Sequence, residues 1–325
     1  MFAFLKKPFF VLAPMDDVTD AVFRQVINQC APPNLYFSEF VNVDGLSSRG
    51  RPRLLPKLDC LSTDPPLIAH IWGLNPDNFY LVAKQIASGD LANELGLSEN
   101  FAGIDLNMGC PAKAVVKTGA CSALIKNPDF ALEIIQATKS GAGNVFPVSV
   151  KTRLGYDQIN PEWIKFLLDQ HLAMLSVHLR TTKELSLVPA HYKELKWIKT
   201  MRDELSPETL LVANGDILNR SAGLKLITEY GIDGAMIGRG IFQDPYAFSI
   251  DSQWTIASRQ EKIDLFKYHL ELFKQWADSP DKGIKRMNKY AKIYVNGFNG
   301  AKELRENIAK ANTINEMLSA LMLEQ

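Results

Sequence analysis

The sequence has few cysteines, no long apolar run and no excess of charge of either sign. Its four cysteines stand at positions 30, 60, 110 and 121, and no two of them form a C-x-x-C pair. This pattern is typical of a reducing compartment and argues against a disulfide framework or a structural zinc site. The longest apolar stretch near the start, 9–14, is too short to span a membrane, and Lys6 and Lys7 break the pattern of a signal peptide. We therefore expect a cytoplasmic protein that has no metal site and is not bound to a membrane.

The charges balance, with 36 basic and 36 acidic side chains among 325 residues. This balance argues against a uniformly basic nucleic-acid-binding protein, so any site for a polyanion must be local. The apolar fraction of 46% is ample for a packed core, and the length suits one large domain or two ordinary ones.

Eight short runs rich in Val, Ile, Leu or Phe recur through the first 240 residues, with segments of helical spacing between them. The runs are 9–13, 36–41, 67–72, 103–108, 147–152, 174–179, 210–214 and 235–238. Continuous apolar strands that alternate with helices indicate a parallel sheet covered on both faces. No G-x-G-x-x-G follows the first run, which disfavours a doubly wound dinucleotide-binding sheet. We predict a (β/α)₈ TIM barrel over residues 1–250.

The strand-like runs stop near residue 250, and the tail has helical spacing instead. Ser258 and Glu261 form the pattern of a capping box before apolar residues that recur up to Trp276. Further helices are expected after Pro280 and from about Ala301 or Thr313 to the end. We predict a small C-terminal all-α helical domain over residues 251–325.

Polar or reactive side chains follow nearly every predicted strand, at the end of a barrel where active sites form. Cys110 lies in a turn set by Gly109 and Pro111, which could present its thiol, although a lone cysteine is often a buried apolar residue. A buried Lys151 or an unpaired His178 at the end of a strand costs free energy unless the side chain meets an anion or an acceptor. This cost favours a functional role for both residues.

The last two predicted strands each lead into a glycine turn that could bind phosphate. The turns are Asn214-Gly215-Asp216 and Gly238-Arg239-Gly240. Barrels often build a phosphate site after strands 7 and 8, where glycines let backbone N–H groups approach and an arginine adds a charged donor. Simple turn chemistry is the alternative. Together with the polar residues around the barrel mouth, the two turns suggest a phosphorylated cofactor.

The tail contains a local excess of positive charge. Lys282, Lys285, Arg286, Lys289 and Lys292 fall within eleven residues, and the segment 282–310 has eight basic and two acidic side chains, a net charge of +6. On a helix most of these side chains share one broad face. Such a run is often only a solvated surface, and the alternative is a binding site for a polyanion.

A set of ordered motifs spans about residues 8–320. It consists of Ala13-Pro-Met15, Val18-Thr-Asp20, Ser38-Glu39, Asp105-Leu-Asn-Met-Gly-Cys-Pro111, Val150-Lys-Thr-Arg-Leu-Gly155, His178 with Arg180-Thr181, Asn214-Gly-Asp-Ile217, Met236-Ile-Gly-Arg-Gly240 and, in the tail, Arg286 to Tyr290 and Leu304-Arg305. With these motifs the chain resembles the tRNA-dihydrouridine synthases, flavoenzymes that reduce a uridine in tRNA. That family has a flavin-binding barrel and a helical tRNA-binding domain, which agrees with the layout predicted above.

The resemblance implies an FMN site, a catalytic acid and a tRNA surface. It places FMN against Pro14, Met15, Asp16, His70, Lys151, His178, Asn214, Gly215, Asp216, Gly238 and Arg239. It places Cys110 as the general acid that protonates C5 of uridine while a hydride from FMN adds at C6, with NADPH or NADH as the reductant. Asn107, Arg153, Arg180, Lys285, Arg286 and Lys289 are the expected tRNA contacts, and the uridine must be flipped into the barrel.

Three positions depart from the family pattern: His70 stands where Gln is usual, and Asp17 and Leu179 each replace a glycine. The Gln side chain normally bonds to the flavin ring, and His cannot reproduce its paired amide pattern. Two other functions remain open from the residues: a barrel aldolase in which Lys151 forms a Schiff base, and a tRNA-binding protein without catalysis. No protein partner is evident, so a monomer is the default expectation.

Overall fold

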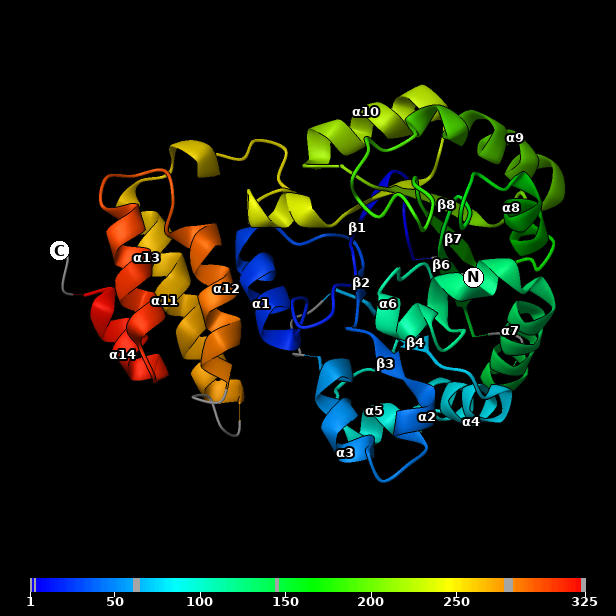
Figure 1. The fold of residues 1–325 in the computed structure, drawn as a ribbon, viewed down its shortest axis with the longest axis horizontal. Helices are drawn as coiled ribbons and strands as arrows, with labels where there is room; N and C mark the ends of the chain where they lie inside the picture. Colours follow the sequence, from blue (N-terminus) through cyan, green and yellow to red (C-terminus); the bar gives the residue numbers. More distant parts are fainter. Residues whose placement is uncertain (1, 3, 61–64, 144–145, 278–282, 323–325) are drawn as a thin grey trace.

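The strands of the computed structural model form a parallel barrel (Figure 1). The structure describes residues 2, 4–60, 65–143, 146–277 and 283–322. Its strands are β1 (Phe9–Leu12), β2 (Tyr36–Phe37), β3 (Val41–Asn42), β4 (Leu67–Trp72), β5 (Gly103–Met108), β6 (Val148–Arg153), β7 (Met174–His178), β8 (Leu210–Asn214) and β9 (Gly234–Ile237). The sheet order is β1-β9-β8-β7-β6-β5-β4-β2, and a parallel bridge between Val11 and Leu35 joins its two ends. The predicted (β/α)₈ fold is confirmed.

One predicted strand, 36–41, is divided into β2 and β3, both of which pair with β4. Between them, the hydroxyl oxygen of Ser38 accepts the backbone N–H of His70 at 2.9 Å. A side chain thus takes the place of a backbone carbonyl, and the regular ladder is interrupted.

Helices surround the barrel and follow most of its strands. They are α1 (Ala21–Cys30), α2 (Val43–Leu46), α3 (Arg51–Leu54), α4 (Pro76–Ala87), α5 (Asp90–Glu94), α6 (Lys113–Val116), α7 (Pro128–Ala142), α8 (Pro161–Leu168), α9 (Leu195–Leu205) and α10 (Arg220–Tyr230), with short 3₁₀ helices η1 (Leu55–Leu58), η2 (Cys121–Lys126), η3 (Tyr192–Glu194), η4 (Arg239–Phe242) and η5 (Trp254–Ile256). Helices α4, α7 and α8 each begin with proline after an asparagine that caps the helix: Asn75, Asn127 and Asn160. Both residue types favour a helix start, so the local sequence sets where these three helices begin.

Alternate residues of the strands pack into two separate clusters. Phe10 and Leu12 pack with the surrounding helices, whereas Phe9 and Val11 belong to a smaller cluster made mostly of strand residues. The alternation follows from the two-residue period of a strand. Along the inward series the side chains turn polar toward the C-terminal ends, for example from Ile68 to His70. The apolar part fills the barrel, and the polar part forms its mouth.

In the part of the tail that the structure describes, four helices pack together beside α1 (Figure 1). They are α11 (Arg259–Trp276), α12 (Ile284–Tyr294), α13 (Ala301–Lys310) and α14 (Ile314–Ala320). The predicted capping box at Ser258 and Glu261 is confirmed. One helix was predicted from Ala301 or Thr313, and the described residues form a helix at each of these starts. A single helix from Ala301 is wrong, because Thr313 caps a new helix by accepting the N–H of Glu316 at 3.1 Å.

The helical tail contacts the barrel through aromatic side chains. Tyr290 of α12 stacks on Phe23 of α1, with ring centroids 5.0 Å apart. Pro280 and Lys282 lie outside the described residues. The domain boundary at residue 250 stays a prediction. Among the described residues, no helix is both long enough and apolar enough to cross a membrane.

Candidate active site

A cavity of about 560 Å³ opens at the C-terminal ends of the strands. It is lined by most of the predicted site residues: Pro14, Met15, His70, Asn107, Cys110, Lys151, Arg153, His178, Arg180, Asn214, Gly215, Asp216, Gly238 and Arg239. Asp16, Lys285, Arg286 and Lys289 do not line it. Phe40 and Gln243 line the cavity and were not predicted. Phe40 directly follows the Ser38-Glu39 motif, which was a usable signal, whereas nothing in the sequence marked Gln243.

The Cys110 turn is held by side chains on two strands. Asn107 accepts the backbone N–H groups of Gly109 at 3.1 Å and Cys110 at 2.9 Å through its Oδ1. Arg153 donates from Nε to the carbonyl of Gly109 at 2.8 Å. Burial raises the pKa of the Cys110 thiol, and this effect outweighs the opposing influence of Lys151 and Arg153. The thiol is therefore protonated at neutral pH and fixed at the cavity wall.

Lys151 places an ammonium group in the cavity. Among the described residues its side chain has no hydrogen bond or ion pair, and burial together with the charge of Arg153 lowers its pKa to about 8. A cation without a partner inside a protein is a binding site for an anion or an electron-rich atom.

His178 and Arg180 form a connected pair at the end of β7. The Nη1 of Arg180 donates to Nε2 of His178 at 3.0 Å, so the proton of the imidazole lies on Nδ1. Burial and the nearby arginines strongly lower the pKa of His178, which keeps it neutral. Arg180 also donates to the carbonyl of Val188 at 2.5 Å and pairs with Asp216. The N–H groups of Arg180 thus bond to acceptors within the protein. Its predicted contact with tRNA stays a prediction.

Arg153, predicted as a tRNA contact, also has internal partners. Its Nη1 donates to the carbonyls of Thr181 and Leu185, both at 2.9 Å, in addition to the bond to Gly109. Burial lowers its pKa to about 10, so the guanidinium remains charged at neutral pH. Arg153 thus ties the Cys110 turn to the loop after β7.

The two glycine turns meet at one end of the cavity. Asp216 accepts from Arg239 at 3.0 Å and from the N–H of Ala190 at 3.2 Å. The backbone N–H groups of Arg239 and Gly240 donate to no other described residue. A Cβ on Gly240 would lie 2.2 Å from the carbonyl oxygen of Leu218, so glycine is required there. Free N–H groups beside an arginine favour a phosphate.

Two polar atoms near the cavity are buried without a partner in the described structure: His70 Nε2 and Asn107 Nδ2. Both residues line the cavity. One atom is an imidazole nitrogen, and the other is an amide nitrogen that donates. Buried polar atoms nearly always have a hydrogen-bond partner in the functional state. They indicate a bound group with both donors and acceptors.

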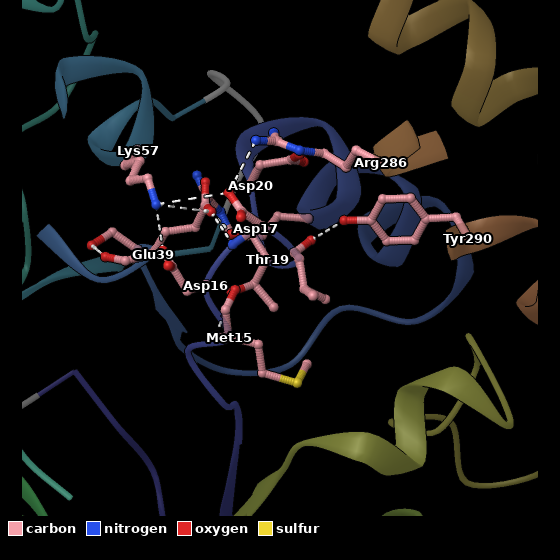
Figure 2. A network of polar contacts seen from close by, with 12 residues as sticks. Met15, Asp16, Asp17, Thr19, Asp20, Glu39, Lys57, Arg286 and Tyr290 are labelled. Carbon is pink, nitrogen blue, oxygen red and sulfur yellow. Dashed lines mark hydrogen bonds and ion pairs between the residues drawn. The ribbon is translucent and has the colours of Figure 1, made fainter. Parts of the chain in front are cut away.

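A network of charges joins the rim of the barrel to α12 (Figure 2). Asp16 pairs with Lys57 and does not reach the cavity. Arg286 donates to Asp20 at 3.0 Å and to Asp17 at 3.2 Å. Asp17 has a positive φ of 55°, a backbone conformation that a glycine would adopt freely.

The remaining basic residues of α12 face solvent. Lys285, Lys289 and Lys292 are exposed, whereas 27% of the Arg286 side chain is exposed. Arg286 differs from these lysines because its charge is balanced by carboxylates of the barrel. Its predicted role in binding tRNA stays a prediction.

Fold and site together define a (β/α)₈-barrel protein with a cationic, cysteine-bearing cavity and a helical extension. A family model described as dihydrouridine synthase (Dus) matches residues 11–324, and the chain belongs to that family.

Named relatives cover nearly the whole chain. It is 44% identical over 320 residues to the probable tRNA-dihydrouridine synthase of Staphylococcus aureus (strain COL), covering 98% of this chain and 93% of that protein. It is 42% identical over 320 residues to the probable tRNA-dihydrouridine synthase 2 of Bacillus subtilis (strain 168), covering 98% and 94%. A solved structure of histamine dehydrogenase from Rhizobium sp. 4-9 shares the fold, with a TM-score of 0.52 and 11% identity over 81% of this chain and 49% of that one.

Proposed function

We propose that this protein is an FMN-dependent enzyme that reduces the C5=C6 bond of a uridine in tRNA to dihydrouridine. The observation that carries the proposal is the protonated thiol of Cys110, fixed in the cavity beside the ammonium of Lys151, which has no partner among the described residues. Membership of the dihydrouridine synthase family and the names of the relatives support it.

The cavity residues fit a flavin mononucleotide. Arg239 and the free N–H groups of Arg239 and Gly240 would hold the phosphate. Asp216 would orient Arg239, and Asn214 is itself fixed by donating to the carbonyl of Met236 at 2.9 Å. Lys151, His178, His70 and the β1 residues Pro14 and Met15 would face the ring. The side chain of Asp16 does not line this cavity and would not contact the cofactor.

FMN, reduced by NADPH or NADH, would supply the hydride that adds at C6 of the uridine. Cys110 would give its proton to C5, and the resulting thiolate would regain a proton from solvent. A thiol suits this task because its raised pKa keeps the proton in place until the carbanion develops. Asn107 holds the turn that aims the thiol, and its buried Nδ2 is available to a bound ring.

The substrate contact beyond the cavity would come from the exposed lysines of α12. A uridine buried in folded tRNA must leave its stack to reach Cys110, and this requires a second surface that holds the rest of the RNA. Lys285 and Lys289 supply local positive charge for that purpose.

The test is a comparison of Cys110→Ala with Cys60→Ala, since Cys60 does not line the cavity. Both purified variants should be yellow, release FMN on denaturation and be reduced by NADPH. Formation of dihydrouridine in tRNA should fall by about two to four orders of magnitude in Cys110→Ala alone. A colourless protein that cannot be loaded with FMN would contradict the cofactor, and unchanged turnover of Cys110→Ala would remove Cys110 from the acid role.

The lowered pKa of Lys151 also suits a Schiff-base aldolase, the second candidate function. Borohydride trapping with phosphorylated carbonyl compounds would reveal a covalent adduct on Lys151. Membership of the dihydrouridine synthase family argues against this function, and the Cys110 turn has no purpose in it. A tRNA-binding protein without catalysis would bind tRNA and form no dihydrouridine in the same assay.

A further inference from the structure

Three polar side chains on adjacent strands form a buried series of hydrogen bonds that ends at His70. Nδ1 of His70 on β4 lies 2.7 Å from Oδ2 of Asp105 on β5, directly across the strand pair. The other oxygen of Asp105, Oδ1, accepts the hydroxyl of Ser149 on β6 at 2.5 Å. All three residues are at most 1% exposed.

This series of hydrogen bonds determines which nitrogen of His70 carries the proton. A carboxylate only accepts, so Nδ1 must donate to Asp105. Burial lowers the pKa of His70 and outweighs the opposing hydrogen bond and charge of Asp105, so the ring is neutral and has a single N–H. Nε2 is therefore an unprotonated acceptor.

No described residue satisfies that acceptor. Nε2 of His70 is buried and has no hydrogen-bond partner in the part of the chain that the structure describes. The ring contacts Phe37 and Phe40 edge-on at centroid distances of 5.8 Å and 5.0 Å, and neither phenylalanine offers a polar donor. The imidazole lines the cavity, so the missing donor has to come from a molecule bound there.

We propose that Asp105 fixes His70 as an obligate acceptor for the imide N–H of the isoalloxazine ring. This inference rests on the proposed function, in which FMN occupies the cavity. A glutamine at this position could turn its amide to offer a donor or an acceptor. His70, with its proton held on Nδ1, offers only an acceptor, and so selects a ring that has a proton at the imide nitrogen. Asp105 is a positioning residue that acts through His70.

The first test measures the wild-type protein and uses one variant only to assign the signal. With ¹⁵N-labelled histidine, His70 should show the Nδ1–H tautomer, as His178 does, and its Nε2 shift should change when FMN binds. His70→Gln assigns that signal. FMN methylated at the imide nitrogen should bind at least tenfold more weakly than FMN. A signal with the proton on Nε2, or equal binding of the two flavins, would overturn the proposal.

The second test separates positioning from structure. In Asp105→Asn the new amide can donate to Nδ1, which lets Nε2 carry the proton and oppose the imide N–H. The Kd for FMN, measured by flavin fluorescence without RNA, should rise about tenfold. In a His70→Gln background the same Asp105→Asn change should leave the Kd of that background unaltered. A loss of equal size in both backgrounds would show a purely structural role and refute the inference.

The uracil ring of the substrate also has an imide N–H, and the two arms of the experiment distinguish the two rings. An Asp105→Asn protein with unchanged FMN affinity and a raised KM for tRNA would overturn the assignment to the flavin. A wild-type protein that binds no FMN at all would refute the proposed function itself. This result differs from a Kd for FMN that is unchanged in Asp105→Asn.

Discussion

Glu39 is a carboxyl group with only 2% of its side chain exposed, at the rim where Figure 2 shows it beside Lys57. Its Oε1 accepts the backbone N–H of Asp17 at 2.6 Å. Burial and the nearby carboxylate of Asp20 raise its pKa to about 7, against the opposing charges of Lys57 and Arg286. The titration range of Glu39 therefore includes neutral pH, and changes in pH around 7 alter the charge of the rim.

A first prediction at the residue scale concerns stability against pH. Because the pKa of Glu39 is higher in the folded chain than its ordinary value of 4.5, the folded state holds this proton more tightly than the unfolded state. Its contribution to the free energy of unfolding is fully present below about pH 4.5 and is lost as the pH rises through about 7. Glu39→Gln keeps the oxygen that accepts from Asp17 and has no proton to lose.

The free energy of unfolding of Glu39→Gln relative to wild type should rise between pH 4.5 and 7, by at most about 1.4 kcal/mol per pH unit, and level off above 7. Urea titrations at several pH values measure it. Glu99→Gln, which removes an exposed carboxylate, is the matched control. A constant difference between wild type and Glu39→Gln over this range would show that Glu39 does not titrate there.

At the residue scale, the sequence predicted where side chains lie in the fold better than it predicted their hydrogen-bond partners. Cys110, Lys151 and His178 could be placed at the barrel mouth because inward positions alternate along a strand and active sites form at the strand ends. The contacts of Arg153 and Arg180 with loop carbonyls were not predictable, because they depend on where the backbone after β7 lies. A motif gives a residue's place in the fold, whereas hydrogen bonds to loop carbonyls require coordinates.

Helices α1 and α12 are joined through one buried carboxylate. Asp20 caps α1 by accepting the N–H of Phe23 at 2.8 Å through Oδ1, and its Oδ2 accepts from Arg286 of α12. Burial raises the pKa of Asp20 in spite of the arginine. Residues 20 and 286 are far apart in sequence, so neither helical spacing nor a charge run could reveal this pairing.

At the element scale we expect Arg286 and Lys289 to behave differently when each is changed to alanine. Arg286→Ala leaves the buried Asp20 without its charged partner and should lower the free energy of unfolding by about 1–3 kcal/mol. Lys289→Ala removes only an exposed charge and should change it by less than about 0.5 kcal/mol. Thermal or urea unfolding of the two variants measures the difference. Equal stability of the two proteins would mean that the Arg286 pair does not hold α12 against the barrel.

The whole molecule has no net charge, yet its charges are unevenly distributed along the chain. The segment 282–310 has a net charge of +6, and its lysines at 285, 289 and 292 are exposed in the helical tail. Part of this positive charge is used internally, since Arg286 faces the barrel carboxylates. Overall charge is therefore a poor guide to polyanion binding here, and the exposed fraction of each basic side chain is a better one.

At the scale of the whole molecule, the exposed lysines of α12 should control the salt dependence of tRNA binding. If they contact backbone phosphates, Lys285→Ala with Lys289→Ala should weaken binding and reduce the slope of log K against log salt by about 1 to 2, because fewer counterions are released. Lys196→Ala with Lys225→Ala removes two exposed lysines from α9 and α10, which lie away from the helical tail in Figure 1, and should leave the slope unchanged. FMN retention should be the same in both double variants, because none of the four lysines lines the cavity. Equal slopes for the two double variants would place the tRNA surface elsewhere, whereas loss of FMN from the α12 variant would show that the tail supports the flavin site rather than the RNA.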